Sequence, residues 1–183
     1  MDAIKITAPG GYTTIQDFGR FGFQNMGVPV SGALDLFACA AANMLVGNPD
    51  NTPVLELTVM GPTFEILREM DMALTGAQMT ITVNDDPAGN WHSFRVKPGD
   101  IVRIGQVQSG CRAYLAASGG FDVPRVMGSF STYVGGTLGG FKGRVLKKDD
   151  VLRVKDAALL TKKRLIPETL IPSYPSIVTA RPV

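Results

Sequence analysis

The chain has 183 residues, of which 45% are hydrophobic and 19% are charged, and its formal net charge is +2. Enough apolar side chain is present for one sizeable core, which excludes a disordered or fibrous protein. No apolar run approaches the roughly 18 residues that span a bilayer, and residues 1–10 lack the basic and apolar regions of a signal peptide. We therefore expect a cytoplasmic protein that has no membrane partner.

Cysteine and histidine usage limits the possible chemistry. Cys39 and Cys111 are too far apart in the chain for a C-x-x-C motif, so alone they form neither a disulfide framework nor a zinc site. His92 is the single histidine, which excludes every site that needs two imidazoles. We expect two buried free thiols, no metal site and no covalently bound cofactor.

Positive charge is concentrated at the C-terminal end. Residues 1–140 contain 8 Lys/Arg against 12 Asp/Glu, whereas residues 141–183 contain 10 against 4. The basic residues up to Arg164 have no interleaved tyrosine or tryptophan that could stack on bases. We interpret them as a solvated face, or as a surface for an acidic partner or a phosphate-bearing ligand, and we expect no nucleic-acid partner.

Frequent chain breakers predict many short strands. The chain contains 21 glycines and 12 prolines, as strands joined by tight turns require. Strands are expected at residues 3–7, 53–59, 63–67, 72–75, 79–83, 93–96, 101–104, 112–117 and 150–154. Turns are expected at residues 84–89 and 97–100. The predicted fold class is mainly β with one principal α-helix.

Residues 13–23 form the chemically densest stretch. Gln16, Asp17 and Arg20 place an amide, a carboxylate and a guanidinium within five residues, close to Gly19 and Gly22. The planar fork of Arg20 suits a carboxylate or a phosphate. We interpret the stretch as a loop that holds a ligand; the alternative is that Asp17 and Arg20 pair with each other and hold the loop in place.

The one predicted helix follows this loop, with Ser31 as its N-cap, residues 33–46 as its body and Gly47 at its C-terminal end. Apolar side chains recur on it at helical spacing. We expect a buried stripe at Leu34, Phe37, Ala38, Ala41 and Leu45.

Two polar residues of this helix have alternative interpretations. Asp35 either complements the helix dipole or belongs to a site. Asn43 is a weak helix former among alanines and needs partners if it is buried. It therefore hydrogen-bonds either to neighbouring loop backbone or to a ligand.

Polar residues also occur on the predicted strands. Glu56 either faces outward or is partly buried. Arg112 and Tyr114 project from one face of their strand, either into a barrel mouth or into water. His92 lies just past a turn, where we expect an exposed or hydrogen-bonded imidazole. Residues 135–140 are rich in glycine but continue into Phe141, so no Gly-Lys-Ser/Thr phosphate loop is formed.

Ordered sequence blocks carry a family resemblance. Residues 11–22 are GYTTIQDFGRFG, residues 27–35 are GVPVSGALD, and residues 42–48 are ANMLVGN. Further blocks follow in the same order, among them ALTGA at 73–77, RAYLA at 112–116 and GGFDVP at 119–124. Over about residues 3–155, the sequence resembles the biotin-dependent carboxyltransferase family, also called allophanate hydrolase subunit 2. That family includes the C-type subunit of bacterial 5-oxoprolinase and half of the carboxyltransferase domain of urea carboxylase.

The resemblance implies an architecture. It implies a cyclophilin-like β-barrel over residues 1–160, then a basic and proline-rich tail at 161–183 that leads to a second half outside this chain. Two positions depart from the family pattern. Gln78 stands where an acidic residue is common, and Phe130 stands between Ser129 and Ser131 where an arginine is common. Without that arginine, anion binding at residues 129–132 has less support.

The resemblance, together with the residue types, also suggests the site. Gln16, Asp17 and Arg20 are the expected catalytic residues. The expected substrate-binding residues are Ser31, Asp35, Asn43, Arg112, Tyr114, Ser129 and Thr132. We expect Arg20 to line a ligand pocket beside the N-terminal end of the helix.

The leading functional expectation is a component of a 5-oxoprolinase-type complex that is similar to its C-type subunit. The complex would use ATP to open a small cyclic amide, with a B-type partner protein related to allophanate hydrolase subunit 1. One alternative is a carboxyltransferase module for urea or a related amide. Its biotin would be carried on another protein or domain, because no lysine here lies in a Met-Lys-Met motif. A second alternative is a regulatory protein that antagonises a kinase inhibitor. We expect the chain alone to have no turnover and to associate with a partner or with its second half.

Overall fold

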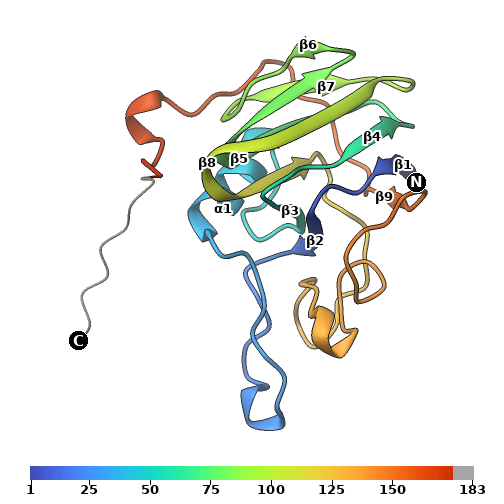
Figure 1. Ribbon diagram of the computed structural model, residues 1–183, viewed down its shortest axis with the longest axis vertical. Helices are drawn as coiled ribbons and strands as arrows, with labels where there is room; N and C mark the ends of the chain where they lie inside the picture. The colour runs from blue at the N-terminus through green and yellow to red at the C-terminus, as the bar shows by residue number, and fades with distance from the viewer. Residues whose placement is uncertain (175–183) are drawn as a thin grey trace.

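The computed structural model describes residues 1–174, which form one curled sheet and a single α-helix (Figure 1). The strands and the helix in chain order are β1 (Asp2–Ala8), β2 (Tyr12–Gln16), α1 (Leu36–Val46), β3 (Val54–Thr58), β4 (Thr63–Ile66), β5 (Met70–Val83), β6 (Asp86–Pro87), β7 (Ser93–Val96), β8 (Ile101–Ala117) and β9 (Val151–Arg153). Short 3-10 turns occupy η1 (Gln24–Met26), η2 (Val134–Gly136) and η3 (Glu168–Leu170). The prediction of a mainly β fold with one principal helix is confirmed.

The sheet is built around the two longest strands. Its strand order is β2-β3-β8-β4-β1-β9, and β5 pairs with β6, β7 and β8. Strands β5 and β8 form a long antiparallel ribbon that runs from Met72 opposite Ala117 to Val83 opposite Val102. Its register shifts between Gly76 and Ile81, and such bulges bend a ribbon and increase its twist. The sheet consequently curls into a half-barrel (Figure 1).

Strand limits differ from the prediction in three respects. The two residues of β6 lie within the turn predicted at residues 84–89 and pair with the end of β5. Residues 72–75 and 79–83 belong to the single strand β5, and residues 101–104 and 112–117 belong to β8. The glycines between them signal breaks in the sequence, but the ribbon accommodates them at bulges. Strand β2 was expected to be loop, yet it pairs with β3 from Tyr12 to Gln16. Pairing with β3 buries side chains that are polar in the sequence.

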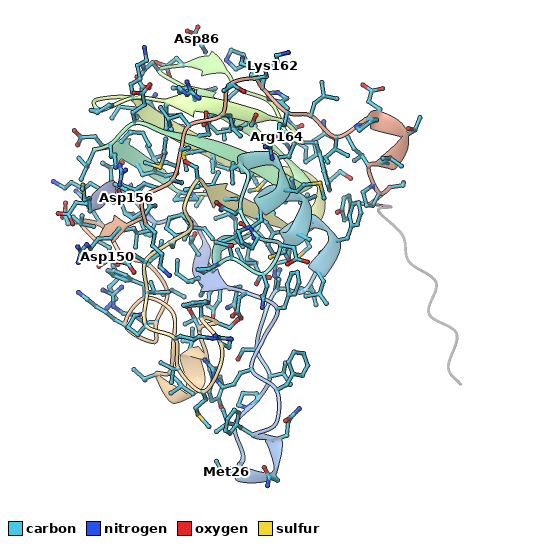
Figure 2. The ribbon with its side chains drawn as sticks, turned by 180° about the vertical axis from the view of Figure 1, so that it is seen from behind. Met26, Asp86, Asp150, Asp156, Lys162 and Arg164 are labelled. Carbon is cyan, nitrogen blue, oxygen red and sulfur yellow. The ribbon has the colours of Figure 1, made fainter. Side chains whose placement is uncertain are left out.

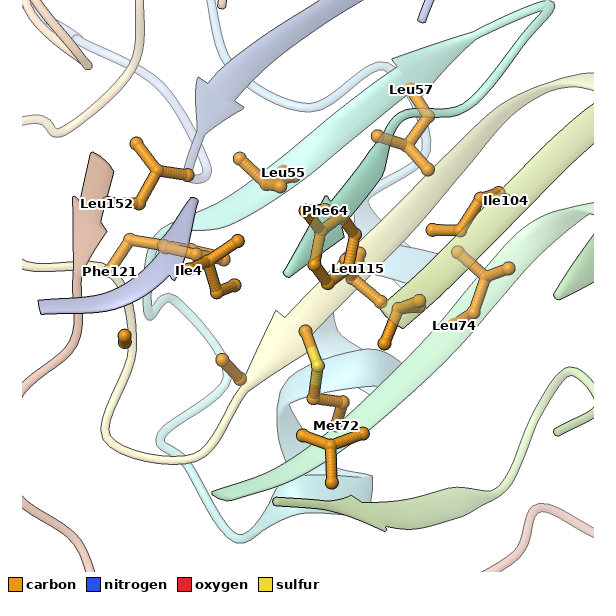
Figure 3. Close-up of a cluster of buried hydrophobic side chains, with 14 of the residues drawn as sticks. Ile4, Leu55, Leu57, Phe64, Met72, Leu74, Ile104, Leu115, Phe121 and Leu152 are labelled. Carbon is orange, nitrogen blue, oxygen red and sulfur yellow. The ribbon is translucent and has the colours of Figure 1, made fainter. Parts of the chain in front are cut away.

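The core fills the concave side of the sheet. Side chains from separate strands meet there, among them Ile4 of β1, Phe64 of β4 and Leu74 of β5, with Leu115 of β8 beside them (Figure 3). These four side chains are fully buried. Burial of each large apolar side chain contributes about 1.5–3 kcal/mol, so this core stabilises the half-barrel on which the loops are carried.

Helix α1 begins later than its sequence predicts. Asp35 is the N-cap, because its Oδ1 accepts from the Ala38 N–H at 2.9 Å. Ser31 has a left-handed φ of 55° and lies outside the helix, so the prediction of Ser31 as N-cap is wrong. The N–H groups of residues 32–34 donate to partners distant in the chain instead of to helical carbonyls. The predicted C-terminal end is confirmed, since Gly47 is the C-cap with a φ of 80°.

A small-residue face of α1 lies against β5 and β8. Ala38, Ala41 and Leu45 are buried there as predicted. The predicted stripe is wrong for Leu34 and Phe37, whose exposed fractions are 73% and 52%. Alanine side chains allow the helix to approach the sheet closely, which leaves the larger apolar side chains on the outer face.

The two cysteines have different surroundings. Cys39 of α1 is fully buried, whereas Cys111 of β8 is exposed, and both thiols are free. The expectation of two buried thiols is therefore wrong for Cys111. Cys111 lies between Ser109, which pairs with Gln78 of β5, and Ala113, which pairs with Gly76. The register shifts between these two pairs, and the Cys111 side chain projects to solvent there.

Three segments extend beyond the sheet. Residues 18–32 form a finger loop with Met26 at its tip (Figure 2). Residues 122–150 form a glycine-rich lobe beside it (Figure 1), and residues 155–174 form a C-terminal strap. The strap holds to the sheet through Leu160 N, which donates to Asp71 Oδ2 at 2.6 Å, and Ile166 N, which donates to the Trp91 carbonyl at 2.9 Å. Residues 175–183 of the predicted tail lie outside the described residues.

Among residues 1–174, no helix has both the length and the apolar character needed to cross a membrane. Helix α1 itself has 11 residues, whereas a spanning helix needs about 20.

Candidate functional site

Asp17 is the centre of a buried polar cluster. It follows β2 directly and is 2% exposed. Its Oδ1 accepts from Ser129 Oγ at 2.6 Å, from Gly19 N at 2.9 Å and from Ser131 Oγ. Its Oδ2 accepts from Phe130 N at 2.7 Å. Three of these four donors belong to residues 129–131 and the fourth to Gly19, so Asp17 joins the finger loop to the glycine-rich lobe.

Arg20 reinforces the same junction. Its side chain is 0% exposed; Nε donates to the Val126 carbonyl at 3.0 Å, and Nη2 donates to the Ser131 carbonyl at 2.8 Å. Gly139 lies against this guanidinium, because a Cβ there would lie 2.6 Å from Nη2. An Asp17–Arg20 pair is not among the ion pairs of residues 1–174, so that alternative interpretation of the loop is wrong.

Gln16 and Thr132 complete the cluster, which we call the loop clamp (Gln16, Asp17, Arg20, Ser129, Ser131 and Thr132). Gln16 Oε1 accepts from Gly32 N at 3.1 Å, and its Nε2 donates to the Thr132 carbonyl at 3.3 Å. Thr132 Oγ1 donates to the Ile15 carbonyl at 2.8 Å. The loop clamp therefore gathers five predicted site residues, all of them buried and bonded within the protein. Their contact with a substrate stays a prediction.

A second polar cluster lies where α1 begins. Glu56 Oε2 accepts from Tyr114 Oη at 2.9 Å and from Leu34 N at 3.0 Å. The Tyr114 hydroxyl oxygen in turn accepts from Asp35 N at 2.8 Å. Arg112 Nε lies 3.7 Å from Glu56 Oε1. Three predicted site residues thus meet around Glu56, a buried residue outside the predicted set that stands opposite Tyr114 in the β3–β8 register.

Two tyrosines of this region are held as hydrogen-bond donors. Burial raises the pKa of the Tyr114 hydroxyl above its usual range, and the nearby Glu56 carboxylate raises it further. Tyr174 of the strap donates to Asp35 Oδ2 at 2.7 Å, and burial together with this bond raises the pKa of Tyr174 as well. Both hydroxyls therefore stay protonated near neutral pH and orient carboxylates.

Asn43 resolves one of the alternatives left by the sequence. Its Nδ2 donates to the carbonyls of Asp50 and Thr52 at 3.0 and 2.8 Å, and its Oδ1 accepts from Asn48 Nδ2 at 3.1 Å. The amide thus binds the backbone of the loop after α1, as one interpretation predicted. Ser31 lies in the arm of the finger loop that returns to α1, within the strained left-handed region.

The described residues also form an open groove beside the β5–β8 ribbon, which we call the ribbon groove. Its volume is about 510 Å³. It is lined by Gly76, Gln78, Met79, Thr80, Ile81, Thr82, Pro87, Gly89, Asn90, Trp91, Gln108, Ser109, Ile171, Pro172 and Tyr174. None of these residues carries a charge at neutral pH. Sequence reasoning missed the groove; its one signal was the uncharged Gln78 at a position where an acidic residue is common.

Comparisons with known proteins assign the family. A family model described as "Carboxyltransferase domain, subdomain A and B" matches residues 26–182. This chain belongs to that family. Its relatives include the urea amidolyase of Saccharomyces cerevisiae, which is 41% identical over 175 residues that make up 93% of this chain and 10% of the relative. The C-type subunit of the Escherichia coli 5-oxoprolinase is 42% identical over 151 residues, or 82% of this chain and 49% of the relative.

Solved structures agree with this assignment. The crystal structure of the Kluyveromyces lactis urea amidolyase matches 95% of this chain and 11% of that chain, with a TM-score of 0.89 and 38% identity. The present chain thus spans about half the length of the 5-oxoprolinase relative and about a tenth of urea amidolyase. The family resemblance expected from the sequence is confirmed, and the relatives named here are an enzyme and an enzyme subunit.

Proposed function

We propose that this chain is a component, similar to the C-type subunit, of a 5-oxoprolinase-type enzyme that opens a small cyclic amide at the expense of ATP. The observation that carries the proposal is the 42% identity to the Escherichia coli 5-oxoprolinase chain over 82% of this chain. Opening an amide requires donors that polarise its carbonyl.

The loop clamp has a positioning role in this proposal. Gln16, Asp17 and Arg20 hold the finger loop against the glycine-rich lobe, and they reach a ligand only when these two segments separate. Asp35, Arg112 and Tyr114 form the second cluster, next to the strap. The proposal places the reaction in the cytoplasm, with ATP bound by the assembled complex.

Reconstitution tests the proposal. The chain is mixed with a B-type partner protein and with the polypeptide that supplies the second half of the family fold, and ATP-dependent hydrolysis of 5-oxoproline is measured. We expect turnover from the assembled mixture and none above background from the chain alone. Steady turnover by the isolated chain would contradict the need for partners, and an inactive but fully assembled complex would contradict the proposed reaction.

A carboxyltransferase role is the second candidate. It is favoured by the description of the family model and by the TM-score of 0.89 to urea amidolyase. In that case the complex would transfer a carboxyl group from biotin on another protein or domain to urea or a related amide. Avidin would then abolish the activity, whereas an ATP-dependent amide hydrolysis without biotin would continue unchanged.

The outer face of α1 supports the proposed assembly. On this face, Phe37 and Met44 are exposed by 52% and 58%, and Leu34, just before the helix, is exposed by 73%. Large exposed apolar patches mark interaction sites. In our proposal the second half of the fold or the B-type partner covers this face.

Phe37→Ser should weaken association at least about tenfold in sedimentation experiments, since a buried aromatic anchor contributes about 2 kcal/mol or more. Unchanged association would place the interface elsewhere.

A further inference from the structure

The ribbon groove has walls of two kinds. Its apolar wall includes Met79, Trp91 and Pro172, and the Phe37 ring lies beside Trp91 at a centroid distance of 6.2 Å. At one end the strap is tied down, because the Tyr174 carbonyl accepts from Ser109 Oγ at 3.0 Å. Cavities that take small molecules have volumes of roughly 300–1,000 Å³ and mix apolar surface with a few polar groups. The groove has this size and character.

Two carboxamides of the polar wall are available to a ligand. Gln78 of β5 and Gln108 of β8 are exposed, and neither amide hydrogen-bonds to another group within residues 1–174. A primary amide offers two donors and an acceptor oxygen. A ligand that carries its own amide can therefore exchange a donor and an acceptor with either glutamine.

Asn90 shows how an amide fits in this groove. With the side chain oriented to satisfy both partners, its nitrogen donates to the Met79 carbonyl at 3.0 Å and its oxygen accepts from Met79 N at 3.1 Å. The Asn90 carboxamide and the Met79 backbone thus exchange two hydrogen bonds, one in each direction, as two paired amides do. The surrounding wall thus already accommodates this chemistry.

Because the groove lining carries no charge, it favours an uncharged ligand over an ionised one. A carboxylate moved from water into this groove would lose hydration without gaining a cationic partner, which is unfavourable. We infer that the ribbon groove binds a small uncharged molecule that carries a carboxamide, lactam or ureido group on an apolar ring. The inference goes beyond the proposed function, because 5-oxoproline carries a carboxylate and the groove lining has no cation to pair with it. The neutral amide bound in the groove is therefore a second ligand and not the molecule that the complex opens.

Three probes of similar size test this selectivity on the full 183-residue chain. 2-Pyrrolidone is the neutral lactam, 5-oxoproline is the same ring with a carboxylate, and cyclopentanone keeps the ring and carbonyl but lacks the N–H. Trp91 is the single tryptophan of the chain, so its indole signal in an NMR titration reports on the groove without ambiguity. We expect saturable shifts with 2-pyrrolidone. Cyclopentanone should bind roughly two- to tenfold more weakly, since one hydrogen bond contributes about 0.5–1.5 kcal/mol. 5-Oxoproline should also bind more weakly, because its carboxylate gains no cationic partner in the groove.

Exposed substitutions test the residues without disturbing the fold. Gln78→Ala should weaken 2-pyrrolidone binding roughly three- to tenfold, the range expected for one lost hydrogen bond. Gln106→Ala is the matched control, because Gln106 is an exposed glutamine of β8 outside the lining, and binding should not change. Gln108→Arg adds a cation to the lining and should raise 5-oxoproline binding to at least that of 2-pyrrolidone.

Several outcomes would overturn the inference. They are equal binding of 2-pyrrolidone and 5-oxoproline, no saturable shift at Trp91, equal effects of Gln78→Ala and Gln106→Ala, or groove signals that respond to the partner protein but to no lactam. Failure here is distinguishable from failure of the proposed function. If a reconstituted complex hydrolyses 5-oxoproline but no lactam binds in the groove, only the inference about the groove is contradicted. If a lactam binds in the groove but the complex shows no ATP-dependent hydrolysis, only the proposed function is contradicted.

Discussion

The loop clamp and the ribbon groove use polar side chains in opposite ways. In the clamp, Asp17 accepts four hydrogen bonds and Arg20 is 0% exposed. In the groove, Gln78 and Gln108 are exposed, and their amides make no hydrogen bond within the described residues. Apart from Arg20 Nη1, which has no partner among the described residues, the buried polar atoms of the clamp stabilise the contact between two loops, while the groove keeps polar groups free for a ligand.

The difference shows what a dense polar motif in a sequence can mean. Charged and amide side chains close together in the chain suggest a site, but the same groups are also suited to crosslinking loops that lack regular hydrogen bonding. A ligand-binding surface can instead arise from uncharged residues on long strands. The two regions should therefore respond differently to mutation: stability should change in the clamp, and ligand affinity in the groove.

The largest expected effect is that of Asp17→Ala. It leaves the hydroxyls of Ser129 and Ser131 and two backbone N–H groups without their acceptor. Each unsatisfied buried donor costs about 1–3 kcal/mol, so the free energy of unfolding in urea should fall by at least about 4 kcal/mol. Asp86→Ala, at an exposed β6 position, is the control and should stay within about 0.5 kcal/mol of the wild type. A loss below about 1 kcal/mol for Asp17→Ala would show that the clamp is dispensable.

Arg20→Lys should have the next largest effect. Lysine keeps the charge but loses the planar fork, so it cannot satisfy both the Val126 and the Ser131 carbonyls. We expect a loss of about 2 kcal/mol and a fall in Tm of about 4–8 °C for a chain of this size. Arg125→Lys, at an exposed arginine in the same lobe, should leave Tm unchanged. If Arg20→Lys instead weakens ligand binding at constant Tm, the guanidinium lines a ligand site, as its sequence first suggested.

Thiol labelling compares a cysteine buried between α1 and the sheet with a cysteine exposed on the β5–β8 ribbon. Burial, together with nearby carboxylates that include Asp17, raises the pKa of the Cys39 thiol to about 12. Cys111 of β8 is exposed. At pH 8 an alkylating reagent should modify Cys111 within minutes and Cys39 at least about a thousandfold more slowly, because only the thiolate reacts. Mass spectrometry of the intact chain should show one modification under native conditions and two in urea. Equal rates would mean that α1 detaches readily from the sheet.

The smallest expected effect concerns acid and the glycine-rich lobe. Burial acts to raise the pKa of Asp150, but the two bonds from Arg144 at 2.7 Å and the Lys147 N–H outweigh it, so the pKa lies below its usual range. A lowered folded-state pKa contributes stability above the unfolded value of about 3.9. That contribution fades as the pH falls through the folded value. Asp150→Asn should thus be about 1 kcal/mol less stable than the wild type at pH 7, and the difference should shrink at pH 2. A difference that stays constant with pH would exclude this linkage.

Sequence reasoning succeeded where structure is determined locally. The turn at Asn84 and Asp85 was predicted from residue types that tolerate positive φ, and both adopt it, at 52° and 73°. The helix end at Gly47 was predicted for the same reason. Where partners lie far along the chain, prediction failed. The helix starts at Leu36 and not after Ser31, because Ala33 N donates to the Asp17 carbonyl and Leu34 N to Glu56.

The site was predictable only in part. The residue types of the clamp were visible in the sequence, but Asp17 bonds to a serine 112 positions away, and no local pattern indicates that partner. The ribbon groove is assembled from separate segments whose residues carry no charge, so the departure from the family pattern at Gln78 was its one signal in the sequence. Glu56 was undecided between an exposed and a buried position until its register with Tyr114 was known.

The packing of Gly139 against Arg20 has a consequence for mutational scanning. A side chain at Gly139 would collide with the guanidinium and with the Ser131 backbone, and Gly140 faces Thr132 in the same way. Gly128 in the same lobe has no atom within 4 Å of a Cβ, although its φ is also positive. In a library of single substitutions, a residue with a Cβ at Gly128 should therefore cost only backbone strain, whereas one at Gly139 or Gly140 should also collide with the clamp. The difference between these glycines would measure how rigidly the clamp is held, without any change to Gln16, Asp17 or Arg20.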